Sequence, residues 1–358
     1  REAIKLLLAA GCRMADHGEF TKRAFMNGKM DLSQAEAVAD VIASRSAAAH
    51  KVAVSQMRGG FSRKLQLLRA QLLKFTSLIE LELDFSEEDV EFADRSQLKA
   101  LSNEIESDLT RLINSFSTGN AVKNGVPVAI VGETNAGKST LLNLLLGDDK
   151  AIVSDIHGTT RDIIEDTIDI GGMLFRFIDT AGIRETTDTI ENLGIKRSYG
   201  AIEKAQIVLW MIDSTQVSEH IDWMAERIVP RTEGKQLFLL FNKIDKLSEE
   251  ERAVLDGMFA DIDARRFFIS AKFDKGLDAV RDALVEASHM AEIDDNDVVV
   301  TNMRHYEALV TAHTAILKVQ EGLANGLSGE FLSMDLHDCL DALGSIVGQI
   351  SSDEVLGE

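Results

Sequence analysis

The sequence has very few cysteines and prolines and no long apolar run. Its two cysteines, Cys12 and Cys339, stand far apart, which excludes a disulfide framework and a zinc site with close ligand pairs. This scarcity favours a reducing, cytoplasmic location. No apolar stretch approaches the roughly 20 residues that a membrane-spanning helix needs, so no membrane association is expected. The only prolines are Pro127 and Pro230, and most loops therefore lack the backbone restriction that proline imposes.

Basic side chains are also scarce. The 358 residues carry 38 Lys and Arg against 59 Asp and Glu, a net charge of −21. This balance argues against a chain-wide surface for nucleic-acid phosphates, so any RNA contact has to be local or borrowed. The length predicts two or three domains, and a hydrophobic content of 45% is enough to give each a core. The chain begins with Arg1 rather than methionine, so we expect the natural amino terminus to lie upstream.

The first third of the chain has the pattern of a helical bundle. We predict one long alanine-rich helix over 33–57, in which Ser33 and Glu36 have the spacing of a capping box. A second helix is expected after the glycine pair at 59–60. A third helix carries apolar residues every three or four positions over 98–112, which indicates one buried face.

The middle of the chain alternates strand patterns with helical ones. Turn residues at 118–125 predict a break in the helical pattern and a domain boundary. A β-branched run at 126–131 then leads into a glycine-rich loop, and four later apolar runs are further strand candidates. Strands that alternate with helices predict a parallel sheet covered by helices on both faces. The later candidates are Leu174–Ile178, Ile207–Ile212, Leu237–Phe241 and Phe267–Ile269.

The last part of the chain begins with an acidic stretch at 294–297. Its spacing lacks the ligands and the closing glutamate of a calcium loop, so we interpret it as a solvated linker. Helical periodicity then resumes over 306–321 and 334–350. Cys339 falls within the second of these segments and is interpreted as a buried helix residue.

Residues 132–139 read Gly-Glu-Thr-Asn-Ala-Gly-Lys-Ser and match the phosphate-binding pattern G-x-x-x-x-G-K-[ST] between a strand and a helix. Backbone N–H groups of such a loop cradle the β- and γ-phosphates of a nucleotide. Lys138 adds a positive charge to these phosphates, and the hydroxyl of Ser139 coordinates Mg²⁺. The residues expected at the nucleotide here are Gly132, Asn135, Ala136, Gly137, Lys138, Ser139 and Thr140.

The segment Asn-Lys-Ile-Asp at 242–245 identifies the base as guanine. Asp245 can accept from both N1–H and the exocyclic amine of guanine, whereas adenine has no matching pair of donors. Sites built on such pairing can discriminate by about 10⁴ or more, which opposes an ATPase. Asn242 and Lys243 complete this motif. Ser270, Ala271 and Lys272 follow another strand candidate and are positioned for backbone donation to guanine O6.

Two further segments stand where a nucleotide switch requires them. The first contains Thr159 and Thr160, which can offer a hydroxyl to the same Mg²⁺ and a backbone amide to the γ-phosphate. We assign the Mg²⁺ ligand to the hydroxyl of Thr160. In the second, Asp179 reaches Mg²⁺ through water and Gly182 meets the γ-phosphate. Both segments can therefore sense the γ-phosphate and relax when it leaves.

The residue after Gly182 is isoleucine, where a small GTPase has a glutamine that orients the attacking water. Hydrolysis must therefore be organised by another residue. Glu185, Asp188 and Glu191 are the candidates within the same segment.

A further signature decides among GTPase families. Residues 18–32 read GEFTKRAFMNGKMDL and are followed by QAEA at 34–37. With the GTPase motifs and the interrupted helical pattern, the chain closely resembles the MnmE family of tRNA-modification GTPases over essentially its whole length. The resemblance implies an α/β P-loop GTPase domain, with a mostly parallel sheet and helices on both faces, inserted into an all-α helical domain.

The resemblance also implies the domain limits. Residues 1–27 correspond to a remnant of an N-terminal α+β domain that binds folate and dimerises. Residues 28–122 and 290–358 correspond to the two parts of the helical domain, and 123–289 to the G domain. The carboxyl-terminal C-x-G-K motif of the family is absent from this chain, and Cys339 lies too early to belong to it.

The activity implied by the resemblance is hydrolysis of GTP to GDP and phosphate, stimulated by K⁺ and by dimerisation of the G domains. The family acts as a homodimer with MnmG, a partner that depends on FAD. Together they add an aminomethyl-type group to C5 of the tRNA wobble uridine, with a one-carbon unit from a tetrahydrofolate derivative. By position, Asn135 matches the K⁺ ligand, and Glu191 matches the acidic residue that orients the hydrolytic water.

The alternative to this reading is a GTP-dependent RNA-binding switch in ribosome assembly. Hydrolysis would then only time the release from RNA. The sequence offers no basic appendage after the G domain for such a role.

Overall fold

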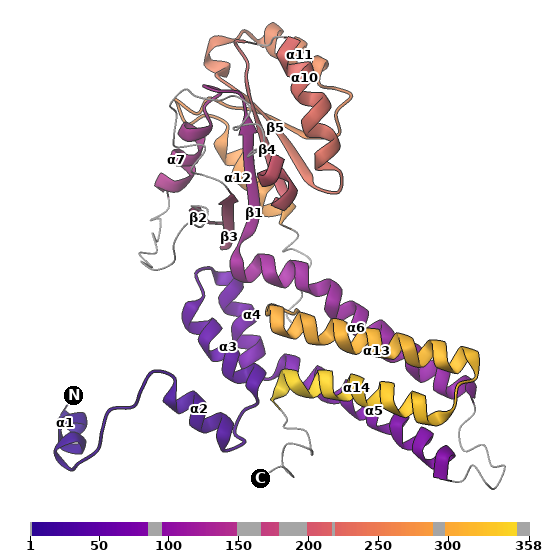
Figure 1. Cartoon of the computed structure of the whole chain (residues 1–358). Helices are drawn as coiled ribbons and strands as arrows, with labels where there is room; N and C mark the ends of the chain where they lie inside the picture. The colour runs from indigo at the N-terminus through magenta and orange to yellow at the C-terminus, as the bar shows by residue number, and fades with distance from the viewer. Residues whose placement is uncertain are drawn as a thin grey trace. The chain divides into compact units, whose positions relative to one another are not determined.

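The structure, a computed structural model, describes residues 2–84, 95–148, 166–178, 199–216, 219–288 and 298–348. The chain divides into two compact units (Figure 1). The helical unit comprises Arg1–Ser44, Ala49–Gly119 and Val298–Glu358. The sheet unit comprises Arg45–Ala48 and Asn120–Asp297. None of the described helices is both long enough and apolar enough to cross a membrane.

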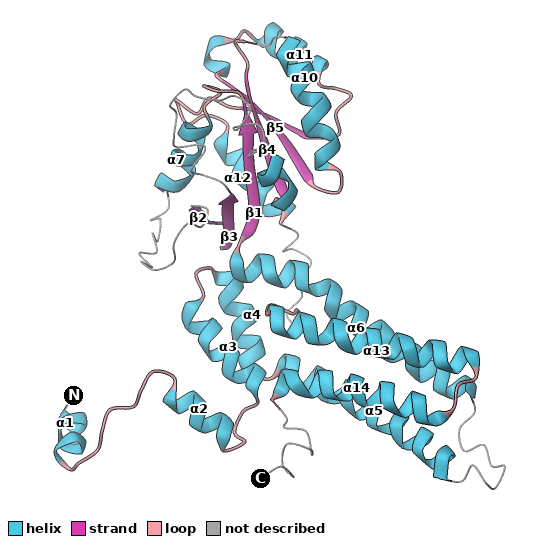
Figure 2. Cartoon of the chain, viewed as in Figure 1, coloured by secondary structure: helices cyan, strands magenta, loops and turns pink. Residues whose placement is uncertain are grey.

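The helices of the first and last parts of the chain are shown in cyan in Figure 2. Two short ones, α1 and α2, precede four that lead to the sheet, and two long ones follow it. Their bounds are α1 Glu2–Ala9, α2 Glu19–Met26, α3 Leu32–Ala43, α4 Ala47–Met57, α5 Gly60–Asp84, α6 Arg95–Asn124, α13 Met303–Asn325 and α14 Gly329–Val347.

The core of the helical unit joins two sections of chain that the sheet unit separates in sequence. Leu68 and Phe75 of α5 are fully buried in the same cluster as Ile316 of α13 and Leu336 of α14. Burying side chains of this size stabilises by about 1.5–3 kcal/mol each. The helical unit is therefore complete only when both sections are present.

Several predicted helices are confirmed. The helix after 59–60 is α5, and the apolar stripe at 98–112 lies on α6, where Leu98, Ile105, Leu109 and Leu112 are buried. The segment 306–321 lies within α13, and 334–347 lies on α14, while residues 349–350 are outside the described residues. Cys339 is a buried residue of α14, and burial raises the pKa of its thiol to about 12.

The prediction of one long helix over 33–57 is wrong. Helix α3 ends at Ala43, and Ser44 is extended, with φ −60° and ψ 131°. The Ser44 hydroxyl donates to the Val41 carbonyl at 2.7 Å, the local bonding by which serine competes with a helix.

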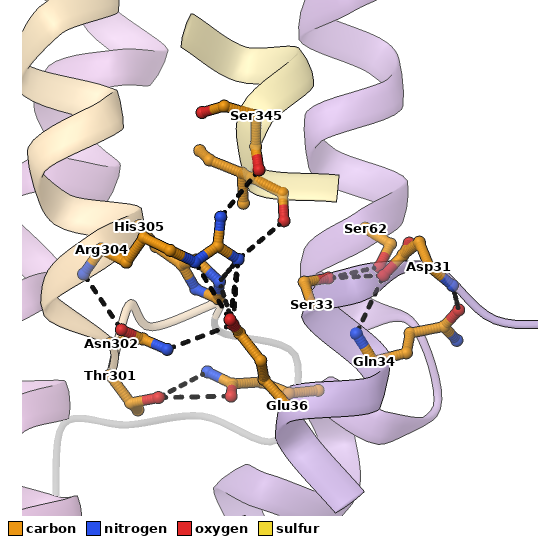
Figure 3. A network of polar contacts seen from close by, with 12 residues as sticks. Asp31, Ser33, Gln34, Glu36, Ser62, Thr301, Asn302, Arg304, His305 and Ser345 are labelled. Carbon is orange, nitrogen blue, oxygen red and sulfur yellow. Dashed lines mark hydrogen bonds and ion pairs between the residues drawn. The ribbon is translucent and has the colours of Figure 1, made fainter. Parts of the chain in front are cut away.

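The capping box also lies elsewhere than predicted. Asp31, not Ser33, caps α3: its Oδ1 accepts from the backbone N–H of Gln34 at 2.8 Å, and Gln34 Oε1 accepts from the N–H of Asp31 at 3.0 Å (Figure 3). Glu36 therefore does not close the box. It serves instead in contacts with α13 described below.

The two units divide between Gly119 and Asn120, inside the predicted range 118–125, but the helix does not break at 118, because α6 continues to Asn124. The glycine that suggested a turn, Gly119, has a different purpose. A Cβ at this position would stand 2.1 Å from the carbonyl oxygen of Val300, so a side chain would push the later section of chain away from α6. The turn itself comes at Gly125, with φ 91°, directly before the first strand.

In the part of the sheet unit that the structure describes, six strands form one sheet in the order β2-β3-β1-β4-β5-β6. All neighbouring pairs are parallel except β2 and β3, which are antiparallel. The five predicted strands are confirmed, but β2 was not predicted, although Gly171 and Gly172 after it have φ 63° and 84°, as a tight hairpin requires. The bounds are β1 Val126–Gly132, β2 Asp166–Ile170, β3 Met173–Ile178, β4 Ile207–Asp213, β5 Gln236–Asn242 and β6 Arg265–Phe268.

Helices cover the sheet on both faces. Val128 and Ile130 of β1 pack in a core with α7 (Lys138–Asp148) and α12 (Leu277–Ala287). Their neighbours Ala129 and Val131 belong to a second core with α10 (Glu219–Ile228) and α11 (Glu249–Met258). Successive side chains of a strand point to opposite faces, so β1 is buried on both. The predicted fold class, an α/β P-loop unit with a mostly parallel sheet set within a helical unit, is confirmed.

Candidate nucleotide-binding site

The carboxyl ends of the parallel strands form the candidate site. Strand β1 ends at Gly132, β4 at Asp213 and β5 at Asn242. The chain places β3 on one side of β1 and β4 on the other, so the direction of strand addition reverses next to β1. Ligands of open α/β sheets bind at such a reversal, beyond the carboxyl ends of the strands.

The loop that follows β1 has a backbone that only certain residues can adopt. Gly132 and Gly137 have φ 144° and 105°. A Cβ on Gly132 would lie 2.2 Å from the backbone oxygen of Met211, so glycine is required by space as well as by conformation. Asn135, at the exposed tip of the loop, has φ 64°, which asparagine tolerates better than most residues.

Lys138 opens α7 and folds its side chain back over the loop. Its Nζ donates to the carbonyl oxygens of Gly132 at 2.8 Å and Glu133 at 2.6 Å. Burial lowers the pKa of this amine, although the charge of Glu133 acts in the opposite direction. The amine and the N-terminus of α7 thus place positive charge at one end of the loop, the arrangement that binds phosphate.

Asn242 ties the phosphate loop to the segment 270–272. Its Nδ2 donates to the carbonyl oxygen of Ala136 at 2.8 Å, and its Oδ1 accepts from the backbone N–H of Ala271 at 2.9 Å. The side chain is 3% exposed, so both bonds form away from water. This N–H of Ala271 is one of those expected to serve guanine O6, and in the structure Asn242 receives it.

Asp245 is exposed and held by a buried neighbour. Ser270 Oγ donates to Asp245 Oδ1 at 2.5 Å, and this hydrogen bond lowers the pKa of the carboxyl. The backbone N–H of Ser270 donates to Lys275 and its carbonyl accepts from the same residue, which closes the turn beyond β6. An ionised, oriented carboxylate that accepts hydrogen bonds is what the recognition of N1–H and an exocyclic amine needs.

One residue of this edge was missed in the sequence. Asp213 Oδ2 accepts from Lys243 Nζ at 2.5 Å, so the lysine of the guanine motif is paired with the end of the neighbouring strand. The signal was available, because an aspartate directly after the apolar run 207–212 must fall at the carboxyl edge of a parallel sheet.

Comparisons with known proteins show the family of the chain. A family model described as the MnmE helical domain matches residues 32–358. The tRNA modification GTPase MnmE of Bacteroides thetaiotaomicron is 58% identical over 359 residues, which span 99% of this chain and 77% of that protein. The chain belongs to the MnmE family. The MnmE of Parabacteroides distasonis is 55% identical over 358 residues, 100% of this chain and 77% of its own length.

The resemblance of residues 18–32 and 34–37 to the MnmE family is thereby confirmed. Among solved structures, Era of Aquifex aeolicus bound to GDP and AlF₄⁻ is 27% identical, with a TM-score of 0.37. The match covers 53% of this chain and 66% of that one.

For this MnmE-family chain, the structure brings together part of the predicted site. The described residues are Gly132, Asn135, Ala136, Gly137, Lys138, Ser139, Thr140, Asn242, Lys243, Asp245, Ser270, Ala271 and Lys272. Thr159, Thr160, Asp179, Gly182 and Glu191 lie outside the described residues, as do Glu185, Asp188 and the acidic stretch 294–297. Within the described ranges, no group of three His, Cys, Asp or Glu side chains could hold a metal ion.

The part of the site that is described fits a nucleotide phosphate. The two glycine positions of the loop leave no room for a Cβ, and Lys138 supplies the charge. Of the three residues expected to hold Mg²⁺, only Ser139 is among those described, and it lies at the first turn of α7. A single hydroxyl at the end of such a loop is compatible with an Mg²⁺ ion shared with phosphate oxygens.

Proposed function

We propose that this chain binds and hydrolyses GTP, and that the hydrolysis serves tRNA modification, as the names of its relatives state for those proteins. The observation that carries the proposal is the pair of bonds made by Asn242, which joins the phosphate loop to the segment 270–272. Because Ser270 also holds Asp245, the group that reads the base is fixed relative to the loop that binds the phosphates. These hydrogen bonds therefore connect the groups that would bind the base and the phosphates of a guanine nucleotide.

The residues divide the work in the following way. The backbone N–H groups of 132–140 and the amine of Lys138 bind the phosphates, and Asp245 accepts from the guanine edge with Asn242, Lys243 and 270–272 around it. Ser139, Thr160 and, through water, Asp179 would hold Mg²⁺, which neutralises charge on the phosphate oxygens. Thr159 and Gly182 meet the γ-phosphate.

For hydrolysis we propose that Glu191 orients the attacking water. Asn135 would hold K⁺ at the loop, and pairing of two G domains in a homodimer would activate the site. The exposed position of Asn135 at the tip of the loop supports such a role, because an ion there is open to a second copy of the chain.

The wider role is proposed from the family. The chain would act in the cytoplasm with an MnmG-type, FAD-dependent partner to add an aminomethyl-type group at C5 of the tRNA wobble uridine. A tetrahydrofolate derivative would supply the carbon. The proposed domain limits are 1–27, 28–122, 123–289 and 290–358.

The test of this role compares wobble uridines in tRNA from cells with and without the intact gene, by nucleoside mass spectrometry. Loss of the C5 modification is expected without the gene. Unchanged tRNA together with accumulated ribosome precursors would instead favour a GTP-dependent switch in ribosome assembly.

The ion site has a separate test on the purified chain. GTP turnover in K⁺ is expected to exceed turnover in Na⁺, and Asn135→Ala is expected to remove the difference. Glu191→Ala should keep GTP binding and lose most turnover. Full turnover in Glu191→Ala would contradict the role given to this residue.

A further inference from the structure

Asp213 is an acidic side chain at the nucleotide edge of the sheet to which the proposed function gives no role. It is the last residue of β4, pairs in register with Asn242 of β5, and is 7% exposed. Its Oδ2 accepts from Lys243 Nζ at 2.5 Å. Its Oδ1 accepts from the backbone N–H of Thr215 at 3.0 Å and from the Thr215 hydroxyl at 2.7 Å. Both carboxylate oxygens therefore bind donors of the chain itself.

The pairing keeps Asp213 charged. Burial by itself raises the pKa of this carboxyl, but the hydrogen bonds from Lys243 and Thr215 outweigh burial and hold the pKa below its usual value. The carboxylate is thus a fixed negative charge, at the end of a central strand, that draws the amine of Lys243 toward it.

Lys243 needs such an anchor because its backbone is unusual. It has φ 67°, a left-handed conformation that is unfavourable for a residue with a side chain. The turn that begins there continues into the short 3₁₀ helix η3, Ile244–Lys246, where the N–H of Lys246 donates to the carbonyl of Lys243 at 3.0 Å. This turn leads from the buried Asn242 to the exposed Asp245 within three residues.

We infer that Asp213 is a positioning residue for guanine recognition. By holding the amine of Lys243 it fixes the left-handed turn, and the turn sets Asp245 where it accepts from the guanine edge. This inference rests on the proposed function. An ion pair with a structural role alone would weaken the binding of every nucleotide by the same factor. A positioning role changes the discrimination made at the base edge.

The test compares the affinities of the full chain for GDP and for inosine diphosphate. Inosine diphosphate lacks the exocyclic amine from which Asp245 accepts a hydrogen bond. Asp213→Asn keeps the size of the side chain and removes its charge. We expect it to lower the ratio of GDP to inosine diphosphate affinity by about tenfold, the size of one hydrogen bond to a charged group. An unchanged ratio in a variant that still folds overturns the inference.

Two further variants complete the design. Asp256→Asn removes another acidic partner in the same unit, one that pairs with Arg266 at 3.1 Å, and should leave the ratio unchanged. Thr215→Val removes one donor to Asp213 from an exposed position and should lower the ratio by less than Asp213→Asn does. If Asp213→Asn does not fold, an unchanged ratio in Thr215→Val is the overturning result.

The unmutated chain separates this inference from the proposed function. If it binds ADP as well as GDP, the proposed function fails. If it prefers GDP and the variants keep the same base discrimination, only the role of Asp213 fails.

Discussion

Glu36 of α3 and Arg304 of α13 are 268 residues apart in the sequence and lie face to face in the helical unit (Figure 3). Arg304 Nε donates to Glu36 Oε1, and Nη2 donates to Oε2, both at 3.0 Å. The same guanidinium donates to the carbonyls of Ser345 at 2.7 Å and Ile346 at 3.0 Å, near the end of α14. One side chain thus joins three helices from both sections of the unit.

Replacing Arg304 is therefore expected to loosen the ends of two helices. Arg304→Gln removes two of the donors to the Glu36 carboxylate and frees the α14 carbonyls, a loss of about 1–3 kcal/mol of local stability. Hydrogen exchange in peptides from α3 and α14 should accelerate accordingly. Arg111→Gln is the control, because Arg111 is an exposed partner of Asp108 at 3.2 Å, and such pairs contribute about 0–1 kcal/mol. Equal exchange in the two variants would contradict the role of Arg304.

The Glu36 contact also predicts a pH dependence. Burial raises the pKa of this carboxyl, but hydrogen bonds from His305 and Arg304 outweigh burial and lower the pKa from 4.5 to about 2. The folded pKa is depressed, so the stabilisation is fully present above about pH 4.5 and is lost as the pH falls toward 2. The difference in unfolding midpoint between the natural chain and Glu36→Gln should therefore be largest at neutral pH and shrink between pH 4.5 and 2. A constant difference over this range would exclude the ionised carboxylate as the cause.

The strands and the phosphate loop could be predicted because their signals are local. The glycine spacing of 132–139 and the apolar runs before and after it need no knowledge of distant residues. The buried face of α6 could also be predicted, from the spacing of its apolar residues. Even β2 had a local signal, the glycine pair at 171–172, which was not used.

The errors arose where tertiary contacts override local pattern. Ser33 and Glu36 have the spacing of a capping box, but the Glu36 carboxylate accepts hydrogen bonds from Arg304. Asp31 is the residue that caps α3. Gly119 has the composition of a turn, but it serves the close approach of Val300, a residue far along the chain. No sequence pattern within a helix or a loop reports such partners.

The candidate site shows the same division. The motif 242–245 identifies the base, but the two hydrogen bonds of the Asn242 side chain to Ala136 and Ala271 depend on the strand order, which brings the loop after β1 and the segment after β6 to the end of β5. The role of Asn242 as a bridge is therefore a structural finding. It yields a prediction of its own.

Asn242→Ala should reduce the affinity for GDP. The change leaves the carbonyl of Ala136 and the N–H of Ala271 without their partner in a buried region, at about 1–3 kcal/mol for each group. Titration calorimetry should show a loss of affinity of tenfold or more, to the order of magnitude that these energies give. Asn103→Ala removes an exposed asparagine of α6 and serves as the control. Unchanged GDP affinity in Asn242→Ala would show that the two hydrogen bonds of Asn242 do not contribute to nucleotide binding.

Two glycines at opposite ends of the same structural motif give the sharpest contrast. Gly132 ends β1 and has φ 144°, a conformation that residues with a side chain rarely adopt. A Cβ on Gly132 would also stand 2.2 Å from a backbone oxygen of Met211, so Gly132→Ala must shift the start of the phosphate loop. We expect nucleotide binding to be lost.

Gly147, in the last turn of α7, has no atom of the described residues within 4 Å of an added Cβ, so the same substitution meets none of them. Gly147→Ala should keep nucleotide binding and stabilise the helix by up to about 1 kcal/mol, because alanine loses less backbone entropy than glycine. Fluorescent GDP titration and thermal unfolding of both variants test the pair. Retained binding in Gly132→Ala would mean that β4 can move away from the loop without cost, which the close register of Gly132 with Met211 opposes.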